Sequence, residues 1–91
     1  MIIYYGREFE KELKKLKKSN PKKYSTVLKK IKFFSLNPDH PSLRLHRLSG
    51  NWKDYFSFSV ASNLRIIFSW KGEDEVMFYK LGTHDQVYRR N

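Results

Sequence analysis

The chain has 91 residues, with 19 Lys and Arg against 9 Asp and Glu, and no cysteine. Its length supports one domain over residues 1–91 and excludes a multidomain enzyme. The lack of cysteine excludes disulfides, thiolate nucleophiles and Cys-based zinc sites. Because no apolar run approaches the roughly 18 residues of a membrane span and no signal-peptide pattern opens the chain, we expect a cytoplasmic protein with no membrane partner.

The N-terminal third predicts a strand followed by two helices. Residues 1–5 are β-branched and aromatic, which favours a short strand ending at Gly6. Residues 7–18 place apolar side chains at helical spacing, with acidic residues in the first turn and lysines in the last. Asn20 followed by Pro21 is a typical start for a second helix. The apolar stripe of that helix comprises Tyr24, Val27, Leu28, Ile31 and Phe34.

Beyond the turn-rich segment 37–41, the apolar pattern changes from helical spacing to the alternation of strands. The predicted strands are residues 42–48, 53–60, 64–70 and 76–81, with a polar hairpin turn over 71–75. The order βααββββ predicts an α+β fold, in which the N-terminal strand and the helix hairpin pack on one face of a mostly antiparallel sheet of four to five strands. Alternation then sends Arg44, His46 and Arg65 to the other, open face. Within residues 64–70 it also predicts Trp70 on the core side and Ile67 on the open face.

The positive charge is concentrated at the N-terminal end. Residues 1–36 hold 11 Lys and Arg against 3 acidic residues, whereas residues 37–91 hold 8 against 6. A field of this sign attracts phosphate polymers and acidic proteins. The competing interpretation is a lysine-rich helix face that only keeps the protein soluble.

The ionisable residues exclude several kinds of chemistry. His40, His46 and His84 are scattered without carboxylate pairs at ligand spacing, so we expect neither a metal nor a cofactor. Neither a Gly-rich phosphate loop nor a GxSxG elbow is present. The remaining imidazole, guanidinium, ammonium and phenol groups fit the metal-free transesterification of RNA. In that reaction a base activates the 2′-OH, cations hold the phosphoryl oxygens and an acid protonates the departing 5′-oxygen.

Three stretches, LHRLSGNWKDYFSFSV, LRIIFSW and LGTHDQVY, resemble the RelE/ParE superfamily of bacterial toxins, most closely its YafQ-like branch. The resemblance runs over nearly the whole chain and implies a RelE-like toxin of a type II toxin–antitoxin system. Such a toxin is a ribosome-dependent endoribonuclease, or mRNA interferase, which cleaves mRNA in the ribosomal A site without metal, leaves a 2′,3′-cyclic phosphate and inhibits translation. The implied partners are a cognate antitoxin, mRNA and ribosomal RNA on the 70S ribosome. The toxin alone is expected to be monomeric and to form a hetero-oligomer with its antitoxin.

Carried over by position, the resemblance assigns four catalytic residues. His46 matches a histidine implicated in the YafQ branch, and His84 matches the histidine favoured as general acid. Arg65 falls where RelE-like members keep a phosphate-binding arginine, and Tyr88 where they keep an aromatic residue able to stack on a base. Further basic side chains are expected to bind RNA, namely Arg44, Lys53 and Arg89.

Two positions depart from the YafQ-like pattern. Ser59 and Asn63 stand where that branch carries a further histidine and an aspartate, and neither is a base at neutral pH. The proton acceptor is therefore open, with His46 as one candidate and Lys53 able to help by charge alone. Two other functions also stay open: a ParE-like inhibitor of DNA gyrase that cleaves nothing, and a non-catalytic basic RNA-binding module. A pure binder has no need for two imidazoles, which favours the nuclease.

Overall fold

The computed structural model describes residues 1–83 of the chain. Strand β1 (Ile2–Tyr5) leads into helices α1 (Arg7–Ser19) and α2 (Pro21–Leu36). Four further strands follow: β2 (His46–Arg47), β3 (Phe56–Ala61), β4 (Leu64–Gly72) and β5 (Glu75–Gly82). The strand order in the sheet is β1-β5-β4-β3-β2, and β1 pairs with β5 in parallel while the other pairs are antiparallel. The predicted α+β fold with a helix hairpin on a mostly antiparallel sheet is confirmed.

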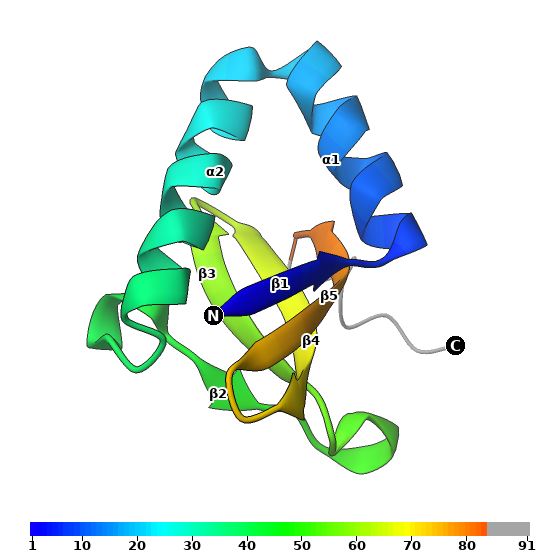
Figure 1. Ribbon diagram of the computed structural model, residues 1–91. Helices are drawn as coiled ribbons and strands as arrows, with labels where there is room; N and C mark the ends of the chain where they lie inside the picture. The colour runs from blue at the N-terminus through cyan, green and yellow to red at the C-terminus, as the bar shows by residue number, and fades with distance from the viewer. Residues whose placement is uncertain (84–91) are drawn as a thin grey trace.

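The two helices meet at the turn between them and spread apart toward the sheet, as an inverted V in Figure 1. The first turn of α1 carries Glu8 and Glu10 and its last turn carries lysines, which suits the helix dipole. Between the helices, the side chain of Asn20 accepts a 3.1 Å hydrogen bond from the backbone N–H of Lys23 and caps α2. Pro21 occupies the first turn, where its missing N–H has no intrahelical partner to lose. These local signals place the hairpin as the sequence predicted.

Aromatic side chains fill the space between the helices and the sheet. Phe34 of α2 stacks on Phe58 of β3 with ring centroids 4.2 Å apart, and Phe68 of β4 meets the Phe34 ring edge-on at 5.1 Å. Phe9 of α1 contacts Phe78 of β5 at 5.2 Å. All five rings are fully buried. Such rings supply large buried apolar area and favourable edge-to-face contacts, so they fix the helices on this face of the sheet.

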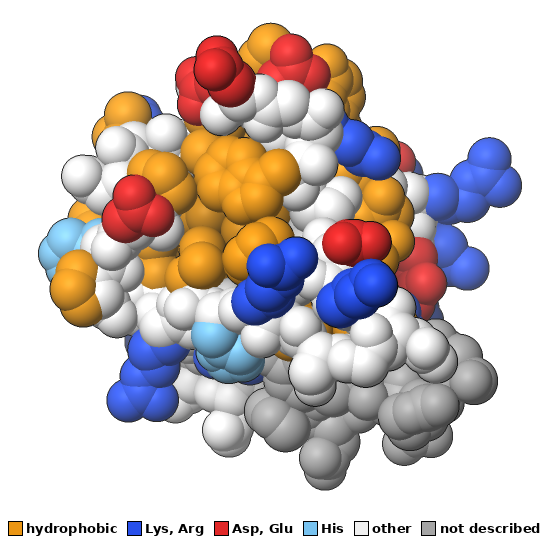
Figure 2. All heavy atoms as spheres, turned by 90° about the horizontal axis from the view of Figure 1, so that it is seen from below, with side chains coloured by type: hydrophobic (Ala, Val, Ile, Leu, Met, Phe, Trp, Pro, Cys, Tyr) orange, Lys and Arg blue, Asp and Glu red, His pale blue; other side chains and the backbone are white. Residues whose placement is uncertain are grey.

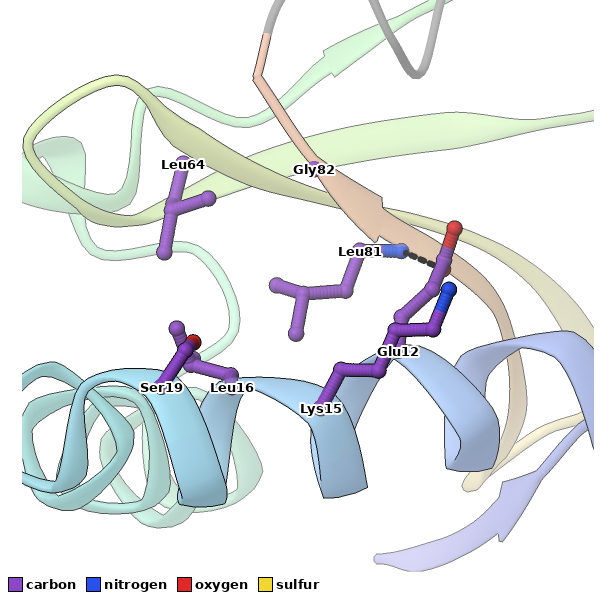
Figure 3. A pocket seen from close by; sticks show the side chains of 7 residues that line it. All are labelled: Glu12, Lys15, Leu16, Ser19, Leu64, Leu81 and Gly82. Atoms are coloured by element: carbon purple, nitrogen blue, oxygen red, sulfur yellow. Dashed lines mark hydrogen bonds between the residues drawn. The ribbon is translucent and has the colours of Figure 1, made fainter.

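Beyond the last residue of β1, the edge of β5 is contacted by helix α1. The N–H of Gly6 donates a 2.9 Å hydrogen bond to the carbonyl of Phe78, and the chain then turns into α1. One turn later, the carboxylate of Glu12 accepts a 2.8 Å hydrogen bond from the N–H of Leu81, as Figure 3 shows. Burial raises the pKa of Glu12, although its bond to Leu81 acts in the opposite direction. The Glu12 side chain thus accepts from a backbone N–H at the edge of β5 that lies beyond the residues paired with β1.

A cavity of about 430 Å³ lies beside that contact, between α1 and the ends of β4 and β5 (Figure 3). Its apolar walls are Leu16, Leu64 and Leu81. Glu12 and Lys15 stand at its charged side.

In the described part of the chain, no helix has both the length and the apolar character that crossing a membrane requires.

The strand predicted over 42–48 is wrong for most of its length. Pro41–Leu43 forms a 3-10 turn, Arg44 follows in the left-handed conformation with φ 51°, and only His46 and Arg47 pair with β3. Proline presets the φ of a helical first turn, and His40 caps that turn by accepting a 3.1 Å bond from the N–H of Ser42 through its Nδ1. The turn buries Leu43 completely.

The predicted faces need three further corrections. Leu28, assigned to the apolar stripe of α2, is 37% exposed, and Trp70, assigned to the core side of β4, is 39% exposed. Ile67, assigned to the open face, is fully buried. Its cross-strand partners are Ser57 and Lys80. On the face away from the helices, the middle of β4 around Ile67 is therefore shielded from solvent.

Candidate functional site

A cluster of polar side chains forms where β2, β3 and β4 lie side by side. His46 of β2 is the register partner of Ser57 in β3, and Arg65 of β4 is the partner of Ser59 in β3. Residues paired or two apart on neighbouring strands project from the same face of a sheet. The register therefore brings His46, Ser57 and Arg65 to one place, on the face that the helices leave uncovered.

The guanidinium of Arg65 is oriented by hydrogen bonds to neighbouring residues of the described segment. Its Nε and Nη2 donate to the hydroxyl oxygen of Ser57 at 3.1 and 3.0 Å. Nη2 also donates to the backbone carbonyl of Arg44 at 2.9 Å. Arg65 is half-buried and Ser57 fully buried. Arginine carries five N–H donors in a planar fork, so a guanidinium held in this way has a defined orientation.

The imidazole of His46 lies next to this guanidinium. Its Nδ1 is 3.5 Å from Nη2 of Arg65, and the residue is exposed. The tautomer decides which ring nitrogen carries the proton of a neutral imidazole, and in either tautomer the other nitrogen can accept a proton. An exposed imidazole beside an oriented guanidinium offers a proton-transfer group and a phosphate-binding cation at adjacent positions.

Two predicted RNA-binding residues, Arg44 and Lys53, lie in the described segment. Arg44 lies in the turn before β2, and the contact it makes to the cluster is through its backbone carbonyl. Lys53 caps the second 3-10 turn, Gly50–Trp52, and its carbonyl accepts a 2.7 Å bond from Nε of Arg47. Both side chains are exposed. The left-handed turn at Arg44 is therefore a structural support for Arg65.

Three predicted site residues, His84, Tyr88 and Arg89, lie outside the described residues. The two positions that depart from the family pattern lie inside. Ser59 is part of β3, directly opposite Arg65. Asn63 sits in the β3–β4 hairpin turn with φ 60°, a left-handed conformation that asparagine tolerates better than most residues.

Sequence reasoning missed Ser57 as a site residue. It was one of two serines alternating with phenylalanines in β3, and the register with β2 and β4 distinguishes it. His40, which carried no predicted role, is occupied with its own turn, and its ring meets Phe33 edge-on at 4.9 Å. Within residues 1–83, no three His, Asp or Glu side chains come together in a way that would hold a metal ion.

A row of three aromatic rings also went unpredicted. Trp52 meets Tyr55 at 5.0 Å, and Tyr55 meets Tyr79 of β5 at 5.0 Å, both edge to face. A hydrogen bond with Ser69 lowers the pKa of Tyr79, and Lys71 acts in the same direction, whereas burial raises the pKa of Tyr55. Figure 2 shows the molecule from the side opposite the helices, where hydrophobic side chains lie beside those of lysine and arginine.

The sequence matches one protein family over residues 1–89, described as the bacterial toxin of type II toxin–antitoxin system, YafQ. No curated protein is matched by sequence.

Solved toxin structures share the fold. A YoeB/ParE toxin from Agrobacterium tumefaciens superposes with a TM-score of 0.79 at 12% identity, covering 92% of this chain and 99% of that one. YafQ from E. coli superposes with a TM-score of 0.72 at 23% identity, covering 94% and 96%. The E. coli DinJ–YafQ complex contains a chain with a TM-score of 0.73 at 22% identity, again covering 94% and 96%.

Proposed function

Because this chain belongs to the YafQ family of bacterial type II toxins, we propose that it is an endoribonuclease that cleaves mRNA in the A site of the translating ribosome. The observation that carries the proposal is the oriented guanidinium of Arg65 next to the exposed imidazole of His46. The strand register assembles this pair on a basic protein, and the pair supplies the two functions that RNA transesterification needs first, a proton acceptor and a charge partner for phosphate.

In the proposed reaction His46 accepts the proton of the 2′-OH, whose oxygen attacks the adjacent phosphorus. Arg65 binds a non-bridging phosphoryl oxygen and balances the charge that develops there. The bond from phosphorus to the 5′-oxygen breaks, His84 donates a proton to that oxygen, and Tyr88 stacks on a neighbouring base. The products are a 2′,3′-cyclic phosphate and a 5′-hydroxyl end. Each proton and electron pair is accounted for without a metal ion.

His46 is assigned the acceptor role because the alternatives are unsuitable. Ser59 and Asn63 stay neutral at physiological pH, and His40 lies at the turn Pro41–Leu43, where its ring packs on Phe33 and not beside Arg65. Arg44, Lys53 and Arg89 add positive charge for the RNA backbone, while the exposed lysines of α1 and α2 bind ribosomal RNA. As a type II toxin, the protein is proposed to form a complex with a cognate antitoxin, whose acidic surface would be drawn to the same charge.

The test is to induce the gene in bacteria and map mRNA 5′ ends. We expect new ends within translated messages for the wild type and few or none for His46→Gln at equal protein levels. His40→Asn is the control, because it removes a histidine without a catalytic role while its side-chain oxygen can still accept from the N–H of Ser42 and cap the turn, and it should cleave like the wild type. Intact messages accompanied by DNA-damage signalling would instead identify a gyrase inhibitor. Intact messages without that signalling would reduce the protein to a basic binder.

A further inference from the structure

The row of Trp52, Tyr55 and Tyr79 has no role in the folded core. The large aromatic residues of the core are fully buried, whereas these three rings keep part of their surface exposed and lie outside the core cluster. Neither the fold nor the proposed cleavage centre uses them. Aromatic side chains that stay partly exposed in a row are the groups that proteins use to stack the bases of single-stranded nucleic acid.

Positive charge lies directly against two of these rings. The ammonium of Lys71 sits 5.9 Å from the ring centroid of Tyr79, and that of Lys80 sits 5.9 Å from the ring centroid of Trp52. Lys80 also forms a 3.9 Å ion pair with Glu8, while Lys71 is exposed. A π face with an adjacent cation matches a nucleotide, which presents a flat base and a negative phosphate.

The sheet register places these rings next to the cleavage centre. Ser57, Ile67 and Lys80 form one row across β3, β4 and β5, and His46 extends that row through β2. Tyr55 lies two residues from Ser57, which corresponds to about 7 Å along a strand. Backbone hydrogen bonding between the β2 and β3 segments continues to Tyr55. The carbonyl of Tyr55 accepts a 2.9 Å hydrogen bond from the N–H of Leu48.

Tyr79 reaches this row through an irregularity in β5. Ile67 pairs with Lys80 and Phe68 pairs with Phe78, so Tyr79 falls between two register partners. An extra residue of this kind redirects a side chain out of strict alternation. The ring of Tyr79 meets that of Tyr55 edge to face, with the two centroids 5.0 Å apart. The irregularity thus brings a second tyrosine beside Tyr55.

We propose that Trp52, Tyr55 and Tyr79 form a stacking subsite for a base next to the scissile phosphodiester, with Lys71 binding the phosphate of that nucleotide. This inference rests on the proposed nuclease function and deepens it. Stacking on aromatic faces tolerates any base but is strongest for the larger purine rings. The subsite therefore favours messages with a purine at that position and positions the strand so that the next phosphate meets Arg65.

The experiment measures binding separately from cleavage. The chain has two tryptophans, so a Trp70→Phe background leaves Trp52 as the fluorescent reporter. A single-stranded oligoadenylate with 2′-O-methyl groups, which has no free 2′-OH and cannot be cleaved by transesterification, is titrated in at low salt. We expect saturable quenching of Trp52, tighter binding of oligoadenylate than of the matching oligouridylate, and a Kd about 10-fold weaker for Tyr79→Leu.

Two variants separate stacking from general effects. Tyr79→Phe keeps the ring and should bind within about twofold of the background protein. Tyr24→Leu makes the same change at a tyrosine of α2 that also has a lysine near its ring, 5.6 Å away, and should leave the Kd unchanged. Thermal unfolding of each variant checks that it is folded.

Three results would overturn the subsite. These are equal quenching by inorganic polyphosphate of matched charge, a Tyr79→Leu variant that binds like the background protein, or an equal loss of binding in Tyr24→Leu. The nuclease proposal fails separately. If His46→Gln abolishes mRNA cleavage while Tyr79→Leu binds RNA normally, the subsite is wrong and the nuclease stands. If Trp52 is quenched as expected but the wild type cuts no translated message, the aromatic row binds RNA and the nuclease proposal is wrong. The row is then not a subsite of a cleavage centre.

Discussion

Arg65 of β4 reaches across to β3 and donates two hydrogen bonds to the buried hydroxyl of Ser57, at 3.1 and 3.0 Å. The two residues are not direct cross-strand partners, since Ser57 pairs with Ile67 and Arg65 pairs with Ser59. The guanidinium therefore lies along the sheet, toward the row that contains His46. This contact determines where the positive charge of the candidate site is held.

Ser57→Ala should impair cleavage more than folding. The change removes the acceptor of two hydrogen bonds from Arg65 and lets the guanidinium turn away. Because misplacement of a positioning group by about 1 Å can cost on the order of 100-fold in rate, we expect a 10- to 100-fold slower cleavage of ribosome-bound mRNA, measured by primer extension. Ser35→Ala in α2, where the hydroxyl donates to the carbonyl of Lys32 in its own helix, is the control and should cleave at the wild-type rate.

Arg65→Lys should keep the charge and lose the function. A lysine cannot reproduce the planar fork that contacts Ser57 and the carbonyl of Arg44 together. We expect a loss of about 1–2 kcal/mol in the free energy of unfolding in urea, as buried polar groups lose partners. Cleavage should fall at least about 10-fold. Cleavage at the wild-type rate would mean that charge alone suffices and that the fork geometry is irrelevant.

Glu12 should give the stability a characteristic pH dependence. Burial raises the pKa of its carboxyl above the ordinary value of 4.5, so the folded state binds the proton more tightly than the unfolded state. Its contribution is then present at low pH and is lost as the pH rises from about 4.5 through the raised value. Glu12→Gln keeps an oxygen for the N–H of Leu81 and should remove this pH dependence. Urea unfolding of both proteins between pH 4 and pH 7 measures the difference.

The same position separates hydrogen bonding from charge. Glu12→Leu leaves the Leu81 donor without its acceptor and should cost about 1–3 kcal/mol at pH 7. The contradicting result is a Gln variant less stable than the Leu variant, because the hydrogen bond at the strand edge would then contribute nothing.

Gly6→Ala should destabilise the junction between β1 and α1. A Cβ atom at Gly6 would lie 2.8 Å from the carbonyl oxygen of Phe78, the same oxygen that accepts the N–H of Gly6. Backbone atoms cannot yield as a flexible side chain can, so we expect a loss of about 1–3 kcal/mol in urea unfolding. Gly72→Ala is the matched control, since the nearest atom to its Cβ is 3.9 Å away. Equal stability of the two variants would remove the argument.

The elements that the sequence predicted well are those specified by local signals. The helix hairpin follows from helical spacing, the Asn20 cap and Pro21, all of which act within one turn. The strand over 42–48 was wrong because alternation over a few residues is a weak signal beside Pro41, whose fixed φ favours a helical turn. A left-handed Arg44 has no clear signature in the sequence.

The candidate site was predictable only in part. Arg65 and His46 were found through a family resemblance, and alternation correctly placed both on the face away from the helices. The partnership with Ser57 depends on register, which a sequence does not specify when serines recur at every second position. Tyr79 depends on an irregularity in β5 that shifts one side chain out of alternation.

The most direct test of the central claim uses purified 70S ribosomes carrying an mRNA with one modified nucleotide in the A site. The nucleotide on the 5′ side of the scissile phosphate has either a 2′-hydroxyl or a 2′-hydrogen, and cleavage is followed in a single turnover. We predict cleavage of the hydroxyl-bearing message to a 2′,3′-cyclic phosphate, and none of the deoxy message, because attack by the 2′-oxygen is the bond-forming step. Equal cleavage of both messages, or cleavage of neither, would contradict the account.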